Sequence, residues 1–200
     1  MEFFCPVCSR GSLRGEVHDH CRHNSSLDGI FIAGDWNNKI LKKAIHRFKY
    51  NFIQDLKNPL GKLLVEKLEQ ADTFFVPALS EGYFEAIVPV PLFSRRELWR
   101  GFNQAELLAR SVGELLLLPV FSGAVRRIKN TKTQVGKNQK ERQKNMLGAF
   151  VPGLEIGEIK GKKVLVVDDV VTTGETMQAV AKVLKSAGAV EVWGLCLARG

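Results

Sequence analysis

The sequence contains no hydrophobic run long enough to cross a membrane. Its longest apolar stretch, from Leu115 to Val120, is interrupted by Pro119, whereas a membrane-spanning helix needs about 20 consecutive apolar residues. The opening MEFFCPVCSR also lacks the basic region and the apolar stretch of a secretory signal peptide. We therefore expect no membrane insertion and a cytoplasmic location.

Internal repeats and low-complexity tracts are absent as well. With 45% hydrophobic and 25% charged residues, the composition is that of a folded, soluble protein rather than a disordered one. A chain of 200 residues suffices for one ordinary domain with a sizeable core and a small appendage.

Acidic residues are scarce in one segment of the chain. The formal net charge is +8, and between residues 126 and 144 only Glu141 is acidic. The eight basic residues of this segment are Arg126, Arg127, Lys129, Lys132, Lys137, Lys140, Arg142 and Lys144. Most of the excess charge therefore lies here, which favours a polyanionic partner such as nucleic acid, a membrane surface or a phosphorylated small molecule.

Large aliphatic residues are few in the first 24 residues, which instead contain Cys5, Cys8, Cys21 and several histidines. Such a segment cannot build a hydrophobic core and needs a metal ion to hold a shape. Metal binding is also more common than disulfide bonding in a cytosolic protein. We interpret residues 1–25 as a small metal-dependent knuckle, and Cys196, which lies in an apolar stretch, as a core residue.

The middle of the chain contains helical and strand patterns. Apolar residues at helical spacing predict two helices within residues 38–70, broken near Asn58-Pro59, and the first of them is rich in lysine. A short apolar strand follows Phe84, and after it come a basic turn, RRELWRGFN, and a helix that Asn103 and Glu106 are expected to cap.

The C-terminal part predicts a strand, a helix and a second strand. The strands are expected at Val164–Val167 and from Val190 to Leu197, with a helix between them from about Glu175 to Ser186. Continuous apolar strands that alternate with helices predict an α/β fold whose parallel sheet is covered on both faces.

A polar segment, DDVVTTG, occupies positions 168–174 after the first of these strands. Ligands of an open parallel sheet bind beyond the carboxyl ends of its strands. Two carboxylates can accept hydrogen bonds from a vicinal diol, and a Thr-Thr-Gly turn at a helix N-terminus offers backbone amides to a phosphate. The composition therefore suits a sugar phosphate.

A purely structural interpretation of the same residues is open. Thr172 with Glu175 fits a helix capping box, and acidic residues before a helix favour its N-terminus. Two adjacent carboxylates, however, repel each other unless a ligand, a metal ion or a basic neighbour is present. The conjunction of the acidic pair and the turn favours a ligand site.

The segment VLVVDDVVTTGETM resembles the phosphoribosyl pyrophosphate signature of type I phosphoribosyltransferases. Together with VPVPLFSRRELWRGFNQAELLAR, RRIKNTKTQVGKNQKERQKNMLGAF and a closing LCLAR, it is similar to the ComF family of competence-associated proteins along essentially the whole chain. The resemblance implies a type I phosphoribosyltransferase fold over residues 81–200, a zinc-finger-like knuckle over 1–25 and a helical hood or linker region over 26–80.

The resemblance also implies roles for individual residues. Asp168 and Asp169 would hold the ribose hydroxyls, and Mg²⁺ would bridge the diol and the pyrophosphate. The residues expected at the 5-phosphate are Val171, Thr172, Thr173, Gly174 and Thr176. Those expected at the pyrophosphate are Arg95, Arg96 and Arg100, for which a solvated helix entrance is the alternative.

Residues 126–146 take the place of the mobile loop that closes over pyrophosphate in such enzymes, with Gln134, Arg142 and Asn145 at the polar positions of the family pattern. Arg142 joins Asp168 and Asp169 as a catalytic candidate, because cationic groups stabilise the departing pyrophosphate. A solvated or nucleic-acid-binding strip is the other interpretation of this loop.

Zinc is the metal implied at the knuckle. Cys5-x2-Cys8 and, after twelve residues, Cys21 match the spacing of a four-cysteine site, but Asn24 stands where the fourth cysteine is expected. A Cys3His set can be completed by His18, His20 or His23, and His23, nearest to the vacant position, is the expected ligand. A decayed site with reactive thiols is the alternative.

Two functions of different classes follow. In the first, the protein binds phosphoribosyl pyrophosphate or an allied anion and handles single-stranded DNA during natural transformation, with proteins of the competence machinery as partners. In the second, it is an active transferase that joins phosphoribosyl to an unknown acceptor with release of pyrophosphate. A receiver-type signalling domain, which the acidic pair also suggests, is disfavoured by the Thr-Thr-Gly turn.

Aromatic residues interleaved with Lys and Arg are candidates for stacking on unpaired bases, although such residues more often belong to a core. They are Phe48, Tyr50, Phe52, Trp99 and Phe102.

Overall fold

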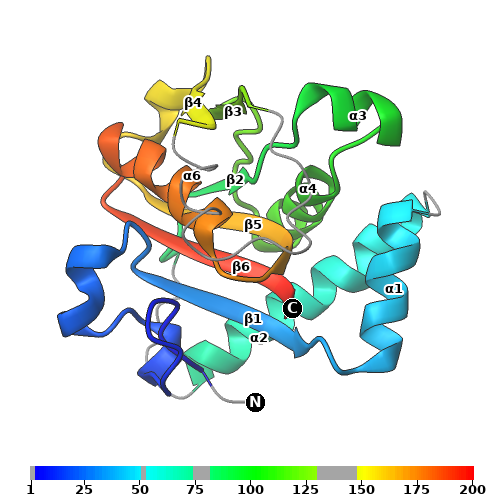
Figure 1. Ribbon diagram of the computed structural model, residues 1–200, viewed down its shortest axis with the longest axis horizontal. Coiled ribbons are helices and arrows are strands. Elements are labelled where there is room, and N and C mark those ends of the chain that lie inside the picture. The colour runs from blue at the N-terminus through cyan, green and yellow to red at the C-terminus, as the bar shows by residue number, and fades with distance from the viewer. Residues whose placement is uncertain (1–2, 51–52, 74–81, 130–147) are drawn as a thin grey trace.

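The computed structural model describes residues 3–50, 53–73, 82–129 and 148–200. Its centre is a four-stranded parallel sheet in the order β1-β6-β5-β2 (Figure 1). The strands are β1 Gly29–Asp35, β2 Ala86–Pro89, β5 Lys163–Val171 and β6 Glu191–Arg199. A separate antiparallel pair is formed by β3 Val125–Arg127 and β4 Phe150–Pro152.

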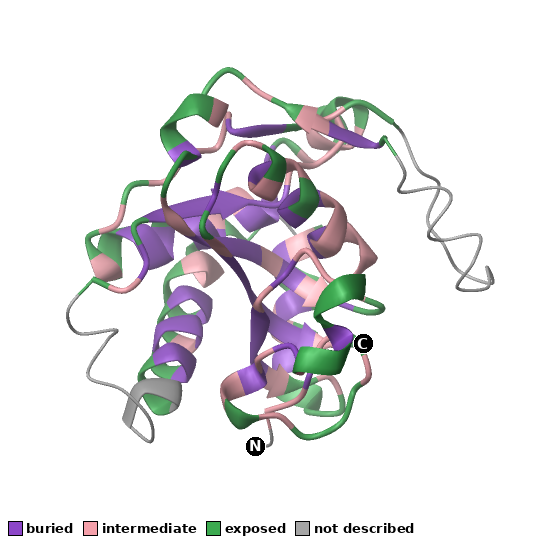
Figure 2. Ribbon diagram, turned by 90° about the vertical axis from the view of Figure 1, so that its left-hand side faces the viewer, coloured by how far each residue is buried: buried purple, intermediate pink, exposed green. Residues whose placement is uncertain are grey.

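Helices cover both faces of the sheet, as the sequence predicted. They are α1 Lys39–Tyr50, α2 Lys57–Thr73, α3 Ser94–Arg100, α4 Gln104–Leu116 and α6 Glu175–Ser186. Successive strand residues point to opposite faces. In β6, Val192 and Cys196 pack with α6 and the β3-β4 pair, whereas Leu195 and Leu197 pack with α1, α2 and α4. The strands are therefore buried between two layers, as Figure 2 shows.

One strand lies where only helices were expected. β1 falls within residues 26–80, yet it pairs with β6 from Gly29↔Trp193 to Asp35↔Arg199. Its apolar run is too short to show a period, and only the pairing with β6 identifies it as a strand. The sheet therefore takes strands from both sides of the boundary at residue 80 that the sequence suggested.

Local signals explain several helix ends. Pro59 lies in the first turn of α2 rather than at a break, where its missing N–H has no intrahelical partner to lose. Asn103 caps α4 as predicted, its side-chain oxygen accepting from the Ala105 N–H at 3.1 Å. Glu106 does not complete a capping box but pairs with Arg110 at 2.6 Å.

Short 3-10 turns occur at η1 Leu13–Gly15, η2 Asp19–Asn24, η3 Gln54–Leu56 and η4 Ile156–Ile159. The basic turn expected after β2 is the helix α3. Among the described residues, no helix combines the length and the apolar character required to span a bilayer.

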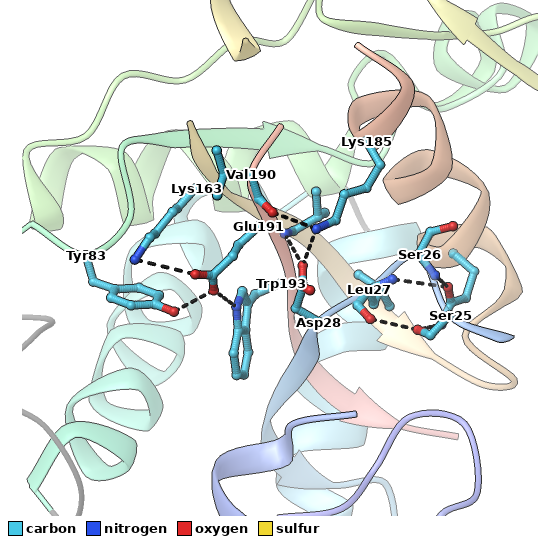
Figure 3. Close-up of polar contacts among 12 residues, drawn as sticks. Ser25, Ser26, Leu27, Asp28, Tyr83, Lys163, Lys185, Val190, Glu191 and Trp193 are labelled. Atoms are coloured by element: carbon cyan, nitrogen blue, oxygen red, sulfur yellow. Dashed lines mark hydrogen bonds and ion pairs between the residues drawn. The ribbon is translucent and has the colours of Figure 1, made fainter. Parts of the chain in front are cut away.

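A polar network ties the amino ends of the strands together (Figure 3). Asp28 accepts a hydrogen bond from the Val192 N–H at 2.7 Å and pairs with Lys185 at 2.8 Å. Glu191 accepts from the Tyr83 hydroxyl at 2.5 Å and from the Trp193 indole at 2.9 Å. Because this network satisfies the polar groups at the amino edge, it fixes the start of β1 relative to β6.

We expect the close contact between Gly29 and the Trp193 ring to be essential for this register. A Cβ at Gly29 would lie 2.2 Å from the ring, with no positive φ to add strain. Gly29→Ala should therefore destabilise the fold by about 1–3 kcal/mol through overpacking. Gly157→Ala, where a Cβ meets nothing within 4 Å, is the control. Urea denaturation measures the free energy of unfolding of both variants. If Gly29→Ala is as stable as Gly157→Ala, the close packing of Gly29 against Trp193 is contradicted.

Candidate functional site

The carboxyl ends of β5 and β6 meet at one edge of the sheet. Strand β5 continues past Val167 to Val171, so Asp168 and Asp169 belong to the strand itself. The turn that follows contains Thr172, Thr173 and Gly174, and α6 begins at Glu175. Gly174, not Thr172, is the N-cap; it lies in the left-handed region, with φ 79°, and has no side chain to cap the helix. The Thr172–Glu175 capping box is therefore not formed, and the backbone amides of the first helical turn remain the anion-binding feature.

Strand alternation sends the two carboxylates to opposite faces of the sheet. Asp169 faces α1, and its Oδ1 lies 2.8 Å from Nζ of Lys49. Asp168 faces the β3 side, where it interacts with Arg127. The Asp169 N–H also donates to Asp168 Oδ1 at 2.8 Å. Each acidic residue thus meets a basic one from a different layer.

Burial raises the pKa of Asp168 to about 7, and the neighbouring Asp169 charge acts in the same direction, whereas Lys49 and Arg127 partly oppose the rise. Burial also lowers the pKa of Arg127, and the nearby Arg96 charge lowers it further. Shifts of this kind, caused by burial and specific charges, are typical of functional sites.

The three predicted pyrophosphate arginines all lie on α3 but differ in surroundings. Arg96 lies near Arg127 and thus on the Asp168 side of the site. Arg100 donates to Gln104 Oε1 at 3.0 Å, and its guanidinium lies 5.3 Å from the centre of the Tyr50 ring. Arg95 is exposed. The catalytic candidate Arg142, with Gln134 and Asn145, lies outside the described residues.

A cavity of about 250 Å³ adjoins the turn after β5. Its lining combines the strand ends and the turn with the N-terminal knuckle: Phe4, Pro6, Val7, Ser9, Ile30, Val171, Thr172, Thr173, Gly174 and Arg199. Thr176 is half-buried in the first turn of α6 and lies outside this lining. The expected phosphate turn therefore lines a hollow to which the knuckle also contributes.

Within the knuckle, the structure gathers Cys5, Cys8, Cys21 and His18, with ligand atoms within 4.8 Å of one another. His18 Nδ1 lies 3.3 Å from Cys8 Sγ, and its Nε2 lies 3.0 Å from the Gly11 carbonyl, to which it can donate. This arrangement corrects the sequence prediction, because His23 is exposed and its Nε2 lies 2.8 Å from Asn24 Nδ2. A helical turn carries His23 away from the cysteines, while the chain before it brings His18 to them.

The cluster fits a structural zinc ion. Three thiolates and one imidazole are a known tetrahedral zinc set, and a ligating histidine commonly donates its other ring N–H to a carbonyl. Burial and the neighbouring thiols Cys8 and Cys5 raise the pKa of Cys21 to about 11. Burial also opposes ionisation of Cys5, but hydrogen bonds from the backbone of Cys8, His18 and Val7 lower its pKa overall. Three thiolates this close together require a bound cation.

Three site residues were not singled out from the sequence. Lys49 belongs to the lysine-rich helix, Arg127 to the basic segment and Arg199 to the closing LCLAR motif. Those local patterns signalled charge, but no pattern within a few residues indicates that each side chain reaches the carboxyl edge of β5. Cys196 is fully buried, as expected.

The aromatic candidates for base stacking divide into two groups. Phe48 and Phe102 are buried core residues, whereas Tyr50 and Trp99 are 46% and 69% exposed. Phe52 lies outside the described residues. Only Tyr50 and Trp99, among those the structure describes, are accessible to a base.

Comparison with known proteins agrees with the fold and the sequence signature. A family model described as the phosphoribosyl transferase domain matches residues 100–199. The chain is 33% identical over 201 residues to Competence protein F of Haemophilus influenzae, an alignment that covers 98% of this chain and 85% of that protein.

Two other relatives carry names from DNA use and competence. The chain is 35% identical over 158 residues to DNA utilization protein YhgH of Escherichia coli, covering 78% of this chain and 66% of that protein. It is 26% identical over 193 residues to Competence protein ComFC of Bacillus subtilis, covering 92% of this chain and 72% of that protein. With the acidic pair and the phosphate-type turn at the carboxyl edge of a parallel sheet, these similarities show that the chain belongs to the ComF family of proteins with a phosphoribosyltransferase domain.

Proposed function

We propose that this protein binds phosphoribosyl pyrophosphate, or an allied ribose 5-phosphate, at the carboxyl edge of β5. The observation that carries the proposal is that an acidic pair near the end of β5 is followed directly by a phosphate-type turn, and that this turn lines a cavity. Amides at the start of α6 would bind the 5-phosphate, with Val171, Thr172, Thr173, Gly174 and Thr176 around it. Asp168 and Asp169 would accept hydrogen bonds from the ribose hydroxyls.

Magnesium would accompany the pyrophosphate. The donors at this edge are hard carboxylate oxygens, as this cation prefers. Burial first and the neighbouring Asp169 charge second raise the pKa of Asp168, and a cation would offset that charge. When bound, Mg²⁺ would neutralise part of the pyrophosphate charge. Arg96 and Arg127 lie on the side of Asp168 where further negative charge would be stabilised.

Transfer of the phosphoribosyl group to an unknown acceptor is the alternative function. The feature that favours it is the cationic surroundings of Asp168, because displacement at the anomeric carbon builds negative charge on the departing pyrophosphate. The predicted contribution of Arg142 belongs to this alternative. Release of pyrophosphate, measured together with binding, separates an enzyme from a binding protein.

A role in handling single-stranded DNA is supported by the exposed face of α1. Lys39, Lys42, Lys43, His46 and Arg47 line an open hollow of about 450 Å³, and residues 39–50 contain no acidic residue. Aromatic rings border this face: Lys42 Nζ lies 5.2 Å from the centre of the Trp36 ring, and the centres of the His46 and Tyr50 rings are 4.8 Å apart. Basic residues beside the partly buried Trp36 ring and the exposed Tyr50 ring suit a phosphate backbone with unpaired bases. By analogy with the names of its relatives, we propose that this surface acts in DNA uptake, with competence proteins as partners.

The ribose phosphate site is tested by calorimetric titration of phosphoribosyl pyrophosphate with Mg²⁺. Replacing Asp168→Asn together with Asp169→Asn should abolish measurable binding, because an amide oxygen accepts hydrogen bonds more weakly than a carboxylate and carries no charge for Mg²⁺. Asp55→Asn, at an exposed aspartate on η3, should bind like the native chain. Failure of the native chain to bind would refute the proposal.

The raised pKa of Asp168 gives a test without ligand. An unfolded aspartate has a pKa near 3.8, so between that value and about 7 the folded chain holds a proton that the unfolded chain has lost. Stability therefore falls as pH rises through this window. The difference in free energy of unfolding, Asp168→Asn minus native chain, should therefore rise between about pH 4.5 and about pH 8. The rise should be at least about 1.4 kcal/mol, the equivalent of one pKa unit. Urea denaturation at both pH values measures this rise, and a constant difference would contradict the raised pKa.

The α1 surface is tested by binding of a fluorescent single-stranded oligonucleotide at several salt concentrations. For Lys42→Gln with Lys43→Gln, the slope of log affinity against log salt should become shallower by about 0.7 for each DNA phosphate that the variant no longer neutralises. Lys160→Gln with Lys182→Gln removes the same charge from exposed positions elsewhere and is the control. An equal decrease in affinity for the two double variants would show a non-specific effect of net charge.

A further inference from the structure

The cavity beside the phosphate turn is built by two parts of the chain from opposite ends of the sequence. Thr172, Thr173 and Gly174 lie on one side, and the knuckle contributes Phe4, Pro6, Val7 and Ser9. Arg199, the last residue of β6, also lines the cavity. Because it pairs in register with Val171 of β5 and Asp35 of β1, its backbone is fixed beside the turn.

The Arg199 side chain is positioned by the knuckle. Its Nη2 donates to Ser9 Oγ at 2.7 Å, and the guanidinium lies 4.3 Å from the centre of the Phe4 ring. These contacts use one N–H donor and one face of the Arg199 guanidinium, which has five N–H donors in all. None of the ion pairs within the described ranges involves Arg199, so its positive charge is available to an anion in the cavity.

Both residues that hold Arg199 are next to metal-site cysteines. Phe4 precedes Cys5, and Ser9 follows Cys8. The intervening loop is closed by hydrogen bonds at 2.9 Å from the Ser9 N–H to the Cys5 carbonyl and from the Cys5 N–H to the Arg10 carbonyl. Ser9 also has φ 60°, in the left-handed region that a serine seldom adopts. The position of its hydroxyl therefore depends on a loop that a metal ion at Cys5 and Cys8 would hold in place.

We propose that Arg199 is a phosphate-binding residue of the ribose phosphate site and that the metal-bound knuckle positions it through Ser9 and Phe4. Metal binding and ribose phosphate binding are then coupled, and the coupling is reciprocal: each ligand strengthens the binding of the other. This inference rests on the proposed function, because it assigns a further residue and a form of regulation to the same pocket.

Ribose 5-phosphate is the direct probe, since it carries the phosphate without the pyrophosphate. In titrations of the zinc-loaded full chain, Arg199→Gln should weaken its binding about tenfold, because a charge-assisted hydrogen bond is removed. Arg199→Lys should restore part of the affinity, and Ser9→Ala should weaken binding less than Arg199→Gln. Arg22→Gln, at an exposed knuckle arginine that pairs with Asp19, changes the same charge and should have no effect.

The coupling has a separate readout in the release of zinc to a colorimetric chelator. Ribose 5-phosphate should slow zinc release from the native chain but not from Arg199→Gln, and removal of zinc should weaken ribose 5-phosphate binding by the native chain more than by Arg199→Gln. Zinc content and thermal unfolding of each variant identify any that do not fold, in which case Ser9→Ala and Arg199→Lys decide the question.

The outcomes distinguish this inference from the proposed function. If the native chain binds ribose 5-phosphate and the Asp168→Asn, Asp169→Asn variant does not, but Arg199→Gln binds it equally well, Arg199 only attaches the knuckle to the sheet and the inference fails alone. If the native chain binds neither ribose 5-phosphate nor phosphoribosyl pyrophosphate, the proposed function fails first. Zinc release that is unaffected by ribose 5-phosphate would overturn the coupling.

Discussion

Two adjacent carboxylates at the buried end of a parallel strand set the main constraint on this structure. Because neighbouring strand residues face opposite sides, Asp168 and Asp169 approach different elements, although the charge of Lys49 acts on both. Asp169 is matched by Lys49 from α1, and Asp168 faces Arg127 from β3. Unpaired buried charges are costly, so both layers must supply cations to the same edge of the sheet.

The two edges of the sheet perform different tasks. At the amino edge, Asp28 and Glu191 satisfy backbone and side-chain donors and fix the register of β1 against β6 (Figure 3). At the carboxyl edge, the raised pKa of Asp168 and the glycine N-cap of α6, which offers no side chain to the helix amides, are features that a ligand would relieve. The unfavourable features thus lie at the edge where the ligand site is proposed, as expected when the rest of a fold supports a functional site.

The knuckle is more than an appendage to the sheet. Although it is too small for a core of its own, it forms an antiparallel bridge at Glu16↔Gly29 to the start of β1 and reaches Arg199 at the other end of β6. A cluster of three cysteines and one histidine can give this short segment the rigidity that packing cannot. The knuckle and the turn after β5 line one cavity, which places the cysteine cluster close to the proposed ribose phosphate site.

The sequence by itself determined the α/β class, the cysteine cluster of the knuckle, the polar turn after β5 and the bounds of α6. Such features depend on period, spacing and turn residues within a few positions of one another. Only the tertiary structure decided that His18 and not His23 joins the cysteines, that β1 is the fourth strand of the sheet, and that Lys49, Arg127 and Arg199 surround the site. Arg199 and Ser9 are 190 residues apart. The partner of a charge is chosen by how distant elements pack, and no local pattern along the chain encodes that packing.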